Sequence, residues 1–254
     1  MNTNNDQKKK ELLIVIPTYN ERENISGLLS ELMEQVPEIN VLVVDDNSPD
    51  GTAQIVKEFQ RKHPERIFLI EREGKLGLGT AYITGFKWAL QRGYQYIGEM
   101  DADFSHRVQD LLKMIDVIRN GKADVVVGSR YVKGGKTVNW TIDRKILSRG
   151  ASLYVRFWTC MPIKDPTAGF VIYKRQVLET IPLDKISFSG YAFQIEMKFA
   201  AWVQGYKIVE VPITFVDRIE GSSKMNKKIV FEAIKGVPLL VWKRLKGIYS
   251  STNR

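Results

Sequence analysis

Short apolar runs alternate with longer amphipathic segments through the first half of this chain. Strands are expected over residues 12–16, 39–44, 66–70, 96–100 and 124–127. Helices are expected over residues 25–36, 80–92 and 108–118, and around Val56 and Phe59, where apolar residues recur at helical spacing. Strand–helix units of this length predict an α/β fold with a parallel sheet covered by helices on both faces. At 254 residues and 44% hydrophobic content, the chain can bury one such core.

Polar clusters directly follow three of the expected strands. They are residues 17–21, the pair Asp45 and Asp46, and residues 101–103. Because ligand sites of open α/β sheets lie beyond the carboxyl ends of the strands, we expect these clusters to meet at one edge. The first cluster contains neither the G-x-G-x-x-G of a dinucleotide-binding fold nor the glycine-rich loop and lysine of a P-loop. Both nucleotide-binding classes are therefore excluded at this position.

Asp101 and Asp103 flank one small residue, Ala102, after the fourth expected strand. On an extended segment their carboxylates fall on the same side, where they repel each other unless a cation is shared. A hard divalent ion, Mg²⁺ or Mn²⁺, that bridges to substrate phosphates fits such a pair. An isolated Asp-x-Asp is more often a solvated acidic turn, but the acidic pair in the equivalent place after an earlier strand favours the metal site.

A glycine-containing run, residues 74–79, follows the third expected strand. It is either a tight turn into the helix that begins near Thr80 or a contact for a phosphate or a base. Lys75 is the residue whose substitution would separate the two interpretations.

Charge is unevenly spread along the chain. The net charge is +9, and residues 224–254 hold eight basic residues and one acidic residue. This asymmetry argues against a nucleic-acid-binding protein and for contact between one basic end and an anionic surface. The single cysteine, Cys160, excludes an internal disulfide and a multi-cysteine zinc site. Residues 1–10 form a polar tail ending in three lysines, in which we expect no secretion signal.

From residue 229 onward, apolar residues recur at helical spacing while lysines and arginines occupy the polar positions. This pattern is typical of a helix in a membrane interface, with Trp242 and Tyr249 suited to that depth. Two charged residues and a proline interrupt the apolar positions, so the segment falls short of the roughly 20 residues of a membrane span. The alternative is a C-terminal helix that packs its apolar stripe on the domain. We expect a peripheral protein at the cytoplasmic face of a membrane, with no transmembrane span.

A set of ordered motifs resembles the family 2 inverting glycosyltransferases, at residues 16–21, 44–51, 77–82, 100–103 and 128–131. The resemblance is closer to the dolichyl- and polyprenyl-phosphate mannose synthases, through residues 144–150, 165–170, 190–197, 215–218 and 222–224. It implies the GT-A fold, a Rossmann-like mixed sheet with helices on both faces, followed by a C-terminal amphipathic helix. The implied divisions are a polar tail at 1–10, a GT-A catalytic domain at 11–225 and a basic amphipathic membrane-interface segment at 226–254.

The resemblance also implies roles for individual residues. The donor nucleotide would be bound by Pro17, Tyr19, Glu21, Asp46, Asp101, Ala102, Asp103, Arg218 and Lys224, with Lys75 added from the glycine-containing run. Catalysis would fall to Asp101, Asp103, Arg218 and Lys224, and the metal to Asp101 and Asp103. The acceptor phosphate would be received by Arg130, Arg144, Ser148 and Arg149. Taken alone, Pro17 and Tyr19 could simply end a strand, and Arg144 and Arg149 could form a solvated helix face.

Four further positions receive narrower expectations. Several relatives carry a metal-binding glutamine two residues after the second aspartate, where this chain has Ser105, so a third protein ligand at Ser105 is left open. His106 is expected to be a hydrogen-bonding residue rather than a metal ligand or a base. Asp165 and Glu196 are expected to order the arginines rather than to take part in catalysis.

The reaction that the resemblance implies is inverting transfer of mannose from GDP-mannose to a dolichyl or polyprenyl monophosphate. A phosphate monoester has a second pKa of about 6 and is largely anionic at neutral pH, so it attacks without a positioned base. The departing nucleoside diphosphate instead needs its growing charge stabilised. Two alternatives remain open: a family 2 transferase that uses UDP-glucose or another nucleotide sugar on a lipid phosphate or a glycan, and an inert sugar-nucleotide-binding or membrane-scaffold protein.

Overall fold

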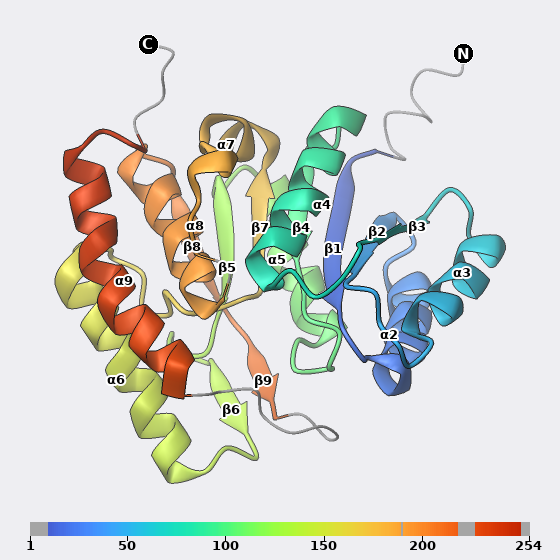
Figure 1. Ribbon diagram of the computed structural model, residues 1–254, viewed down its shortest axis with the longest axis horizontal. Coiled ribbons are helices and arrows are strands. Elements are labelled where there is room, and N and C mark those ends of the chain that lie inside the picture. Colours follow the sequence, from blue (N-terminus) through green and yellow to red (C-terminus); the bar gives the residue numbers. More distant parts are fainter. Residues whose placement is uncertain (1–9, 189, 218–226, 250–254) are drawn as a thin grey trace.

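The computed structural model describes residues 10–188, 190–217 and 227–249, which form a seven-stranded sheet with helices on both faces and a two-stranded sheet beside it (Figure 1). The strands are β1 (Leu12–Thr18), β2 (Ile39–Asp45), β3 (Ile67–Glu71), β4 (Tyr96–Glu99), β5 (Val125–Ser129), β6 (Lys136–Val138), β7 (Val171–Lys174), β8 (Ile208–Pro212) and β9 (Thr214–Val216). The helices are α2 (Arg22–Gln35), α3 (Thr52–Lys62), α4 (Leu78–Arg92), α5 (Val108–Arg119), α6 (Ile142–Thr159), α7 (Arg175–Thr180), the short η1 (Leu183–Lys185), α8 (Tyr191–Val203) and α9 (Lys227–Leu245). All five strands expected from the sequence are confirmed to within two residues at each end.

The alternating side chains of β1 build the two halves of the core. Leu13 and Val15 pack on one face of the sheet, in a buried cluster with residues of α4, α7, α8 and α9. Leu12, Ile14 and Ile16 pack on the other face with residues of α2, α3 and α5. Because both faces are covered, β1 is apolar at successive positions rather than at every second one.

Strand β7 makes the sheet mixed. The strand order is β3-β2-β1-β4-β7-β5-β8, and β7 runs antiparallel to both β4 and β5. Val171 at the start of β7 pairs with Glu99 and Val127, near the carboxyl ends of its neighbours, so the chain enters the sheet from the ligand edge and must run back. The purely parallel sheet predicted from periodicity is therefore wrong, whereas the mixed sheet implied by the family resemblance is confirmed.

The C-terminal helix α9 packs on the body of the domain, against α6 and α8 (Figure 1). Val237, Leu240 and Tyr249 are fully buried. Tyr249 was expected at the depth of a membrane interface, and that expectation is wrong because its ring packs edge-on against Phe199 of α8. Trp242 and Leu245 on the same segment stay exposed. Within the described residues, no helix is long and apolar enough to cross a membrane.

Candidate active site

Loops at the carboxyl ends of β1 and β3 bring two predicted donor-binding residues together. The Lys75 ammonium lies 4.2 Å from the centre of the Tyr19 ring. Pro17 lies inside β1, opposite Val44, so it does not end the strand. This pair offers a positive charge and an aromatic face at the expected edge of the sheet, the two chemistries that a nucleotide requires.

Glu21 lies at the start of α2. Its carboxylate accepts a hydrogen bond from the Asn24 side chain at 2.9 Å, and its backbone N–H donates to the Thr52 hydroxyl at 3.0 Å. Thr52 begins α3, so Glu21 joins the loop after β1 to the loop after β2.

Asp46 fixes the glycine-containing run through Arg72, a residue that sequence reasoning missed. Arg72 Nε donates to Asp46 Oδ1 at 2.5 Å, and its two terminal nitrogens donate to the Thr80 hydroxyl and the Gly77 carbonyl. The other Asp46 oxygen accepts the Leu76 N–H at 3.2 Å. The run is thus an ordered turn into α4, as one of the two interpretations predicted. Arg72 directly follows β3, which is the same positional signal that identified the other clusters.

The two aspartates after β4 lie on a bent segment. The strand ends at Glu99, and the chain then turns through residues 101–106, so the alternation expected of an extended segment does not apply. The Tyr82 hydroxyl nevertheless donates to Asp101 Oδ1 at 3.3 Å. Burial, followed by the negative charges of Asp101, Glu99 and Asp103, raises the pKa of this phenol well above 10. The negative charges of all three carboxylates therefore help to keep the buried Tyr82 hydroxyl protonated and neutral.

Ser105 and His106 orient the aspartates. Asp103 Oδ1 accepts hydrogen bonds from the Ser105 N–H at 3.1 Å and from its hydroxyl at 2.6 Å. His106 Nδ1 accepts the Asp101 N–H at 3.1 Å, and its ring stacks on Phe170 with 4.6 Å between centroids. The expectation that His106 is a hydrogen-bonding residue is confirmed.

The carboxylate oxygens of Asp101 and Asp103 are suitable ligands for a divalent ion. No group of three or more His, Cys, Asp or Glu side chains among the described residues forms a ready-made metal site. Two carboxylates are sufficient for Mg²⁺ or Mn²⁺ when substrate phosphates and water complete the coordination. Since the Ser105 hydroxyl donates to Asp103, its place here is to hold a carboxylate in position.

A fully buried polar network lies behind Asp101. Gln194 Nε2 donates to Glu99 Oε2 at 2.5 Å, and Lys198 Nζ donates to the Ala168 carbonyl at 2.6 Å. Burial raises the pKa of Glu99 to about 7, and the charge of Lys198 opposes this shift. Burial lowers the pKa of Lys198 to about 8, against the opposing charges of Glu99 and Asp165. Lys198 thus interacts with carboxylates on both sides of the site.

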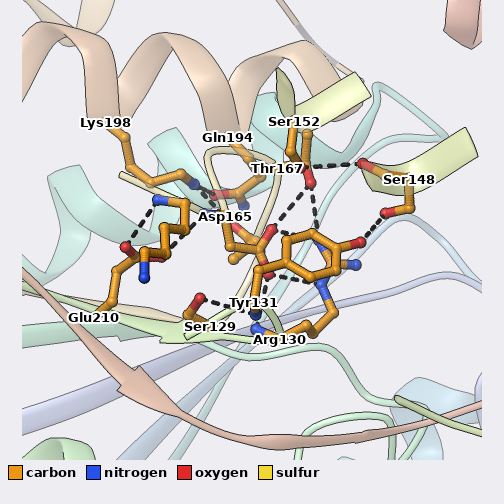
Figure 2. Close-up of polar contacts among 12 residues, drawn as sticks. Ser129, Arg130, Tyr131, Ser148, Ser152, Asp165, Thr167, Gln194, Lys198 and Glu210 are labelled. Carbon is orange, nitrogen blue, oxygen red and sulfur yellow. Dashed lines mark hydrogen bonds and ion pairs between the residues drawn. The ribbon is translucent and has the colours of Figure 1, made fainter. Parts of the chain in front are cut away.

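Arg130 is held by Asp165 at the end of β5 (Figure 2). Its Nε and one terminal nitrogen donate to the two carboxylate oxygens at 2.7 and 2.6 Å, and the terminal nitrogen also donates to the Thr167 hydroxyl. Asp165 has no exposed surface. Burial alone would raise the pKa of its carboxyl, but the neighbouring Arg130 lowers the pKa below 3.8. Asp165 therefore orders an arginine, as expected.

The other predicted acceptor residues lie on α6. Arg144 forms an ion pair with Asp217 at 2.5 Å, and its guanidinium lies 4.3 Å from the Trp140 ring. The Tyr131 hydroxyl donates to the Ser148 hydroxyl at 2.6 Å (Figure 2). A pocket of about 230 Å³ opens between α6 and β6, and it is lined by Arg130, Tyr131, Gly135, Lys136, Thr137, Trp140, Lys145 and Arg149. Arg130 and Arg149 thus share one pocket, which Arg144 and Ser148 do not line.

Two predicted catalytic residues, Arg218 and Lys224, lie outside the described residues.

Gly169, between Asp165 and β7, brings the loop that carries Asp165 close to Asp101 and Gln194. A Cβ atom added there would lie 3.9 Å from Asp101 Oδ2 and 3.8 Å from Gln194 Nε2. The loop that carries Asp165 therefore runs directly past Asp101.

Comparisons with known proteins agree with this arrangement. The family model described as glycosyl transferase family 2 matches residues 13–182. The chain is 45% identical to a polyprenol monophosphomannose synthase of Mycolicibacterium smegmatis over 222 residues, which cover 87% of this chain and 83% of that relative. It is 46% identical to an undecaprenyl-phosphate mannosyltransferase of Micrococcus luteus over 226 residues, which cover 89% of this chain and 92% of that relative. A dolichol-phosphate mannosyltransferase of Pyrococcus furiosus is 39% identical over 236 residues, 90% of this chain and 63% of that relative.

Solved structures agree on the fold. Glucosyl-3-phosphoglycerate synthase from Mycobacterium tuberculosis, in complex with Mn²⁺, UDP and its glucosylated product, superposes with a TM-score of 0.65 at 15% identity, covering 94% of this chain and 81% of that one. A second structure of that enzyme, in complex with Mg²⁺ and UDP, gives a TM-score of 0.64 at 16% identity, with the same coverage. Taken with the matched family model, these comparisons establish that the chain belongs to glycosyltransferase family 2 and has the GT-A fold of its enzymes.

Proposed function

We propose that this enzyme transfers mannose from GDP-mannose to a polyprenyl or dolichyl monophosphate, with inversion at the sugar. The observation that carries the proposal is the juxtaposition of the Asp101 carboxylate with the loop that holds Arg130, at one edge of the sheet. A donor diphosphate on the aspartate side and an acceptor phosphate on the arginine side would meet there. The names of the relatives support mannose as the sugar and a polyprenyl phosphate as the acceptor.

On the donor side, Tyr19 and Lys75 offer a ring and a charge to the nucleotide, and Asp46 keeps the loop of Lys75 in place. Asp101 and Asp103 would hold a divalent ion, Mg²⁺ or Mn²⁺, as the chemistry of two carboxylates permits. When bound, such an ion neutralises the charge that develops on a leaving diphosphate. Tyr82 and Ser105 keep the two carboxylates oriented by hydrogen bonding.

On the acceptor side, the attacking oxygen needs no base because a phosphate monoester is already anionic at neutral pH. The contacts of Asp165 and His106 agree with this mechanism. Both Asp165 oxygens accept hydrogen bonds from Arg130, and His106 Nδ1 accepts the Asp101 N–H, so these contacts give both side chains an orienting role. The chain's contribution is then to position two anions and to stabilise the departing charge.

A lipid acceptor must be reached at a membrane, and α6 offers the surface for it. Ile142, Ile146, Leu153 and Phe157 recur at helical spacing, and each is more than half exposed. Lys145, Arg149 and Arg156 run along one flank of this apolar face. An apolar face with a basic flank is suited to the headgroup region of an anionic bilayer.

The neighbouring α9 exposes two further apolar side chains, Trp242 and Leu245. We therefore propose peripheral attachment at the cytoplasmic face of a membrane, through α6 first and the C-terminal segment second. The main membrane contact is therefore assigned to α6 rather than to the segment at 226–254, because part of that segment's apolar stripe packs on the domain.

The test is transfer from radiolabelled GDP-mannose to polyprenyl phosphate in detergent with Mg²⁺ or Mn²⁺, with UDP-glucose in parallel and a chelator control. A metal-dependent, organic-extractable mannosyl product supports donor, acceptor class and reaction together. Label from UDP-glucose alone would overturn the donor assignment but keep the lipid-phosphate mechanism. Absence of labelled lipid from either donor would overturn the acceptor.

A further inference from the structure

The pocket beside α6 contains more positive charge than the predicted acceptor residues supply. Two of its basic residues, Lys136 and Lys145, are not among the four residues predicted to receive the acceptor phosphate. Arg130 is neutralised by Asp165. Lys136, Lys145 and Arg149 have no ion pair with any carboxylate in the part of the chain that the structure describes, so the pocket carries about three uncompensated positive charges.

The residue expected to supply charge here, Arg144, is already engaged. Its guanidinium pairs with Asp217 and lies over Trp140. Lys145, the next residue along α6, points instead to the pocket and lies one helical turn from Arg149. Lys136 begins β6 and reaches the same pocket from a different element. The charges thus approach the cavity from two elements, which a solvated helix face alone would not produce.

The pocket also adjoins the apolar face of α6. Ile142 and Ile146, neighbours of Lys145 in sequence, are 74% and 65% exposed. A ligand bound in the pocket can therefore have an anionic group among the lysines and an apolar chain along α6. A phosphate monoester on a prenyl chain has this composition, with a charge of about −1.5 to −2 at neutral pH.

We propose that Lys136 and Lys145 bind the phosphate of the lipid acceptor together with Arg149, and that they determine its affinity rather than the rate of transfer. The inference rests on the proposed function, because it names further residues of the same acceptor site. Arg130, which also lines this pocket, is held by Asp165, and the loop that carries Asp165 runs past Asp101.

The experiment uses geranyl phosphate, a short and soluble isoprenyl phosphate, so that acceptor binding is separated from membrane binding. Lys136→Gln, Lys145→Gln and the double variant are compared with Lys133→Gln. Lys133 is an exposed lysine in the loop just before β6, and it does not line the pocket. Calorimetry without donor gives the Kd for geranyl phosphate, and geraniol serves as the control without phosphate. Each charge-assisted hydrogen bond lost should weaken binding on the order of tenfold.

In the transfer assay, each single pocket variant should raise the KM for geranyl phosphate by a similar factor, with kcat and the Kd for the donor nucleotide within about twofold of wild type. Lys145→Arg should restore most of the affinity, since it keeps the charge. Unchanged Kd and KM in the double variant would overturn the inference. So would an effect confined to binding of phosphatidylglycerol-containing vesicles, which would assign the lysines to bilayer headgroups.

Failure of the proposed function has a different signature. If the wild-type enzyme binds geranyl phosphate but labels neither it nor polyprenyl phosphate from any donor, the reaction is wrong while the phosphate site stands. If the wild-type enzyme transfers mannose and the lysine variants are indistinguishable from it, only the assignment of the lysines fails.

Discussion

The ammonium of Lys243 on α9 lies 2.6 Å from Oε1 of Glu196 on α8, a carboxylate with no exposed surface. The Tyr249 hydroxyl donates to the same oxygen at 2.8 Å, and the second oxygen accepts the N–H groups of Ser187 and Phe188. Glu196 was expected to order an arginine, and it orders a lysine instead. The C-terminal helix is therefore fixed to the catalytic body by a buried ion pair as well as by apolar contacts.

Removing one partner of this pair should destabilise the fold. Lys243→Met leaves the Glu196 carboxylate buried without its cation, which typically costs about 3 kcal/mol or more. We expect the free energy of unfolding, measured by urea denaturation, to fall by that amount. Lys246→Met, an exposed neighbour on the same turn, is the matched control. Equal stability of the two variants would show that the pair contributes nothing to the attachment of α9.

The carboxylates after β4 should be needed for turnover rather than for folding. Asp103→Ala removes a partner that would stabilise the departing diphosphate, so we expect kcat to fall about a hundredfold or more. Ser105→Ala removes only the hydroxyl bond to Asp103 and should have a smaller effect, of roughly tenfold. Asp116→Ala, an exposed carboxylate on α5, should behave as wild type. Wild-type turnover by a folded Asp103→Ala variant would contradict the metal-site assignment.

The apolar face of α6 should determine attachment to vesicles. Replacing Leu153 and Phe157 by serine removes two large exposed apolar side chains without touching the core. Because burying one such side chain is worth about 1.5–3 kcal/mol, vesicle affinity should fall at least about tenfold in a sedimentation assay. Leu112→Ser, an equally apolar but distant exposed site on α5, controls for loss of surface hydrophobicity. An unchanged affinity would remove α6 from the membrane contact.

Local patterns in the sequence were enough to predict the first five strands and the edge at which their polar clusters meet. Each of those strands is a short apolar run followed by its own helix, so its place depends on residues close in the chain. β7 has only four residues, and its direction is set by the loop that carries Asp165, which runs past Asp101. No periodicity in β7 itself records that constraint, and the parallel sheet was predicted wrongly for this reason.

The site was predictable where a residue directly follows a strand and not where distant segments complete it. Asp101 and Asp103 carry a positional signal, and Tyr19 and Lys75 lie on loops after two neighbouring strands. The pocket around Lys136 and Lys145 exists only because β6 pairs with β9 and faces α6. The burial of Tyr249 likewise depends on Glu196, more than fifty residues earlier. Such long-range contacts leave no spacing in the sequence from which to infer them.

The pair formed by Arg130 and Asp165 should show a stability effect that depends on pH. The pKa of the buried Asp165 carboxyl lies below 3.8 in the folded protein, so its charge contributes stability that is complete above pH 3.8 and is lost as the pH falls through the lowered value. Asp165→Asn lacks that charge at every pH. We expect the free energy of unfolding of this variant to be about 3 kcal/mol lower than that of the wild type at neutral pH. This gap between wild type and variant should shrink below pH 3.8.

Urea denaturation at a series of pH values measures this gap, and Asp184→Asn, a surface carboxylate, should give a small gap with no such dependence. Asp165→Asn also replaces one of the two oxygens that accept hydrogen bonds from the Arg130 guanidinium by an NH2 donor. The guanidinium is then held less firmly, so the KM for the acceptor phosphate should rise while donor binding is kept. A gap that stays constant from neutral pH to below pH 3.8 would mean that the carboxylate charge is not what stabilises the pair. In that case the loss in the asparagine variant would come from hydrogen-bond geometry alone, and Asp165→Glu, which keeps the charge but moves it, should be as damaging as Asp165→Asn.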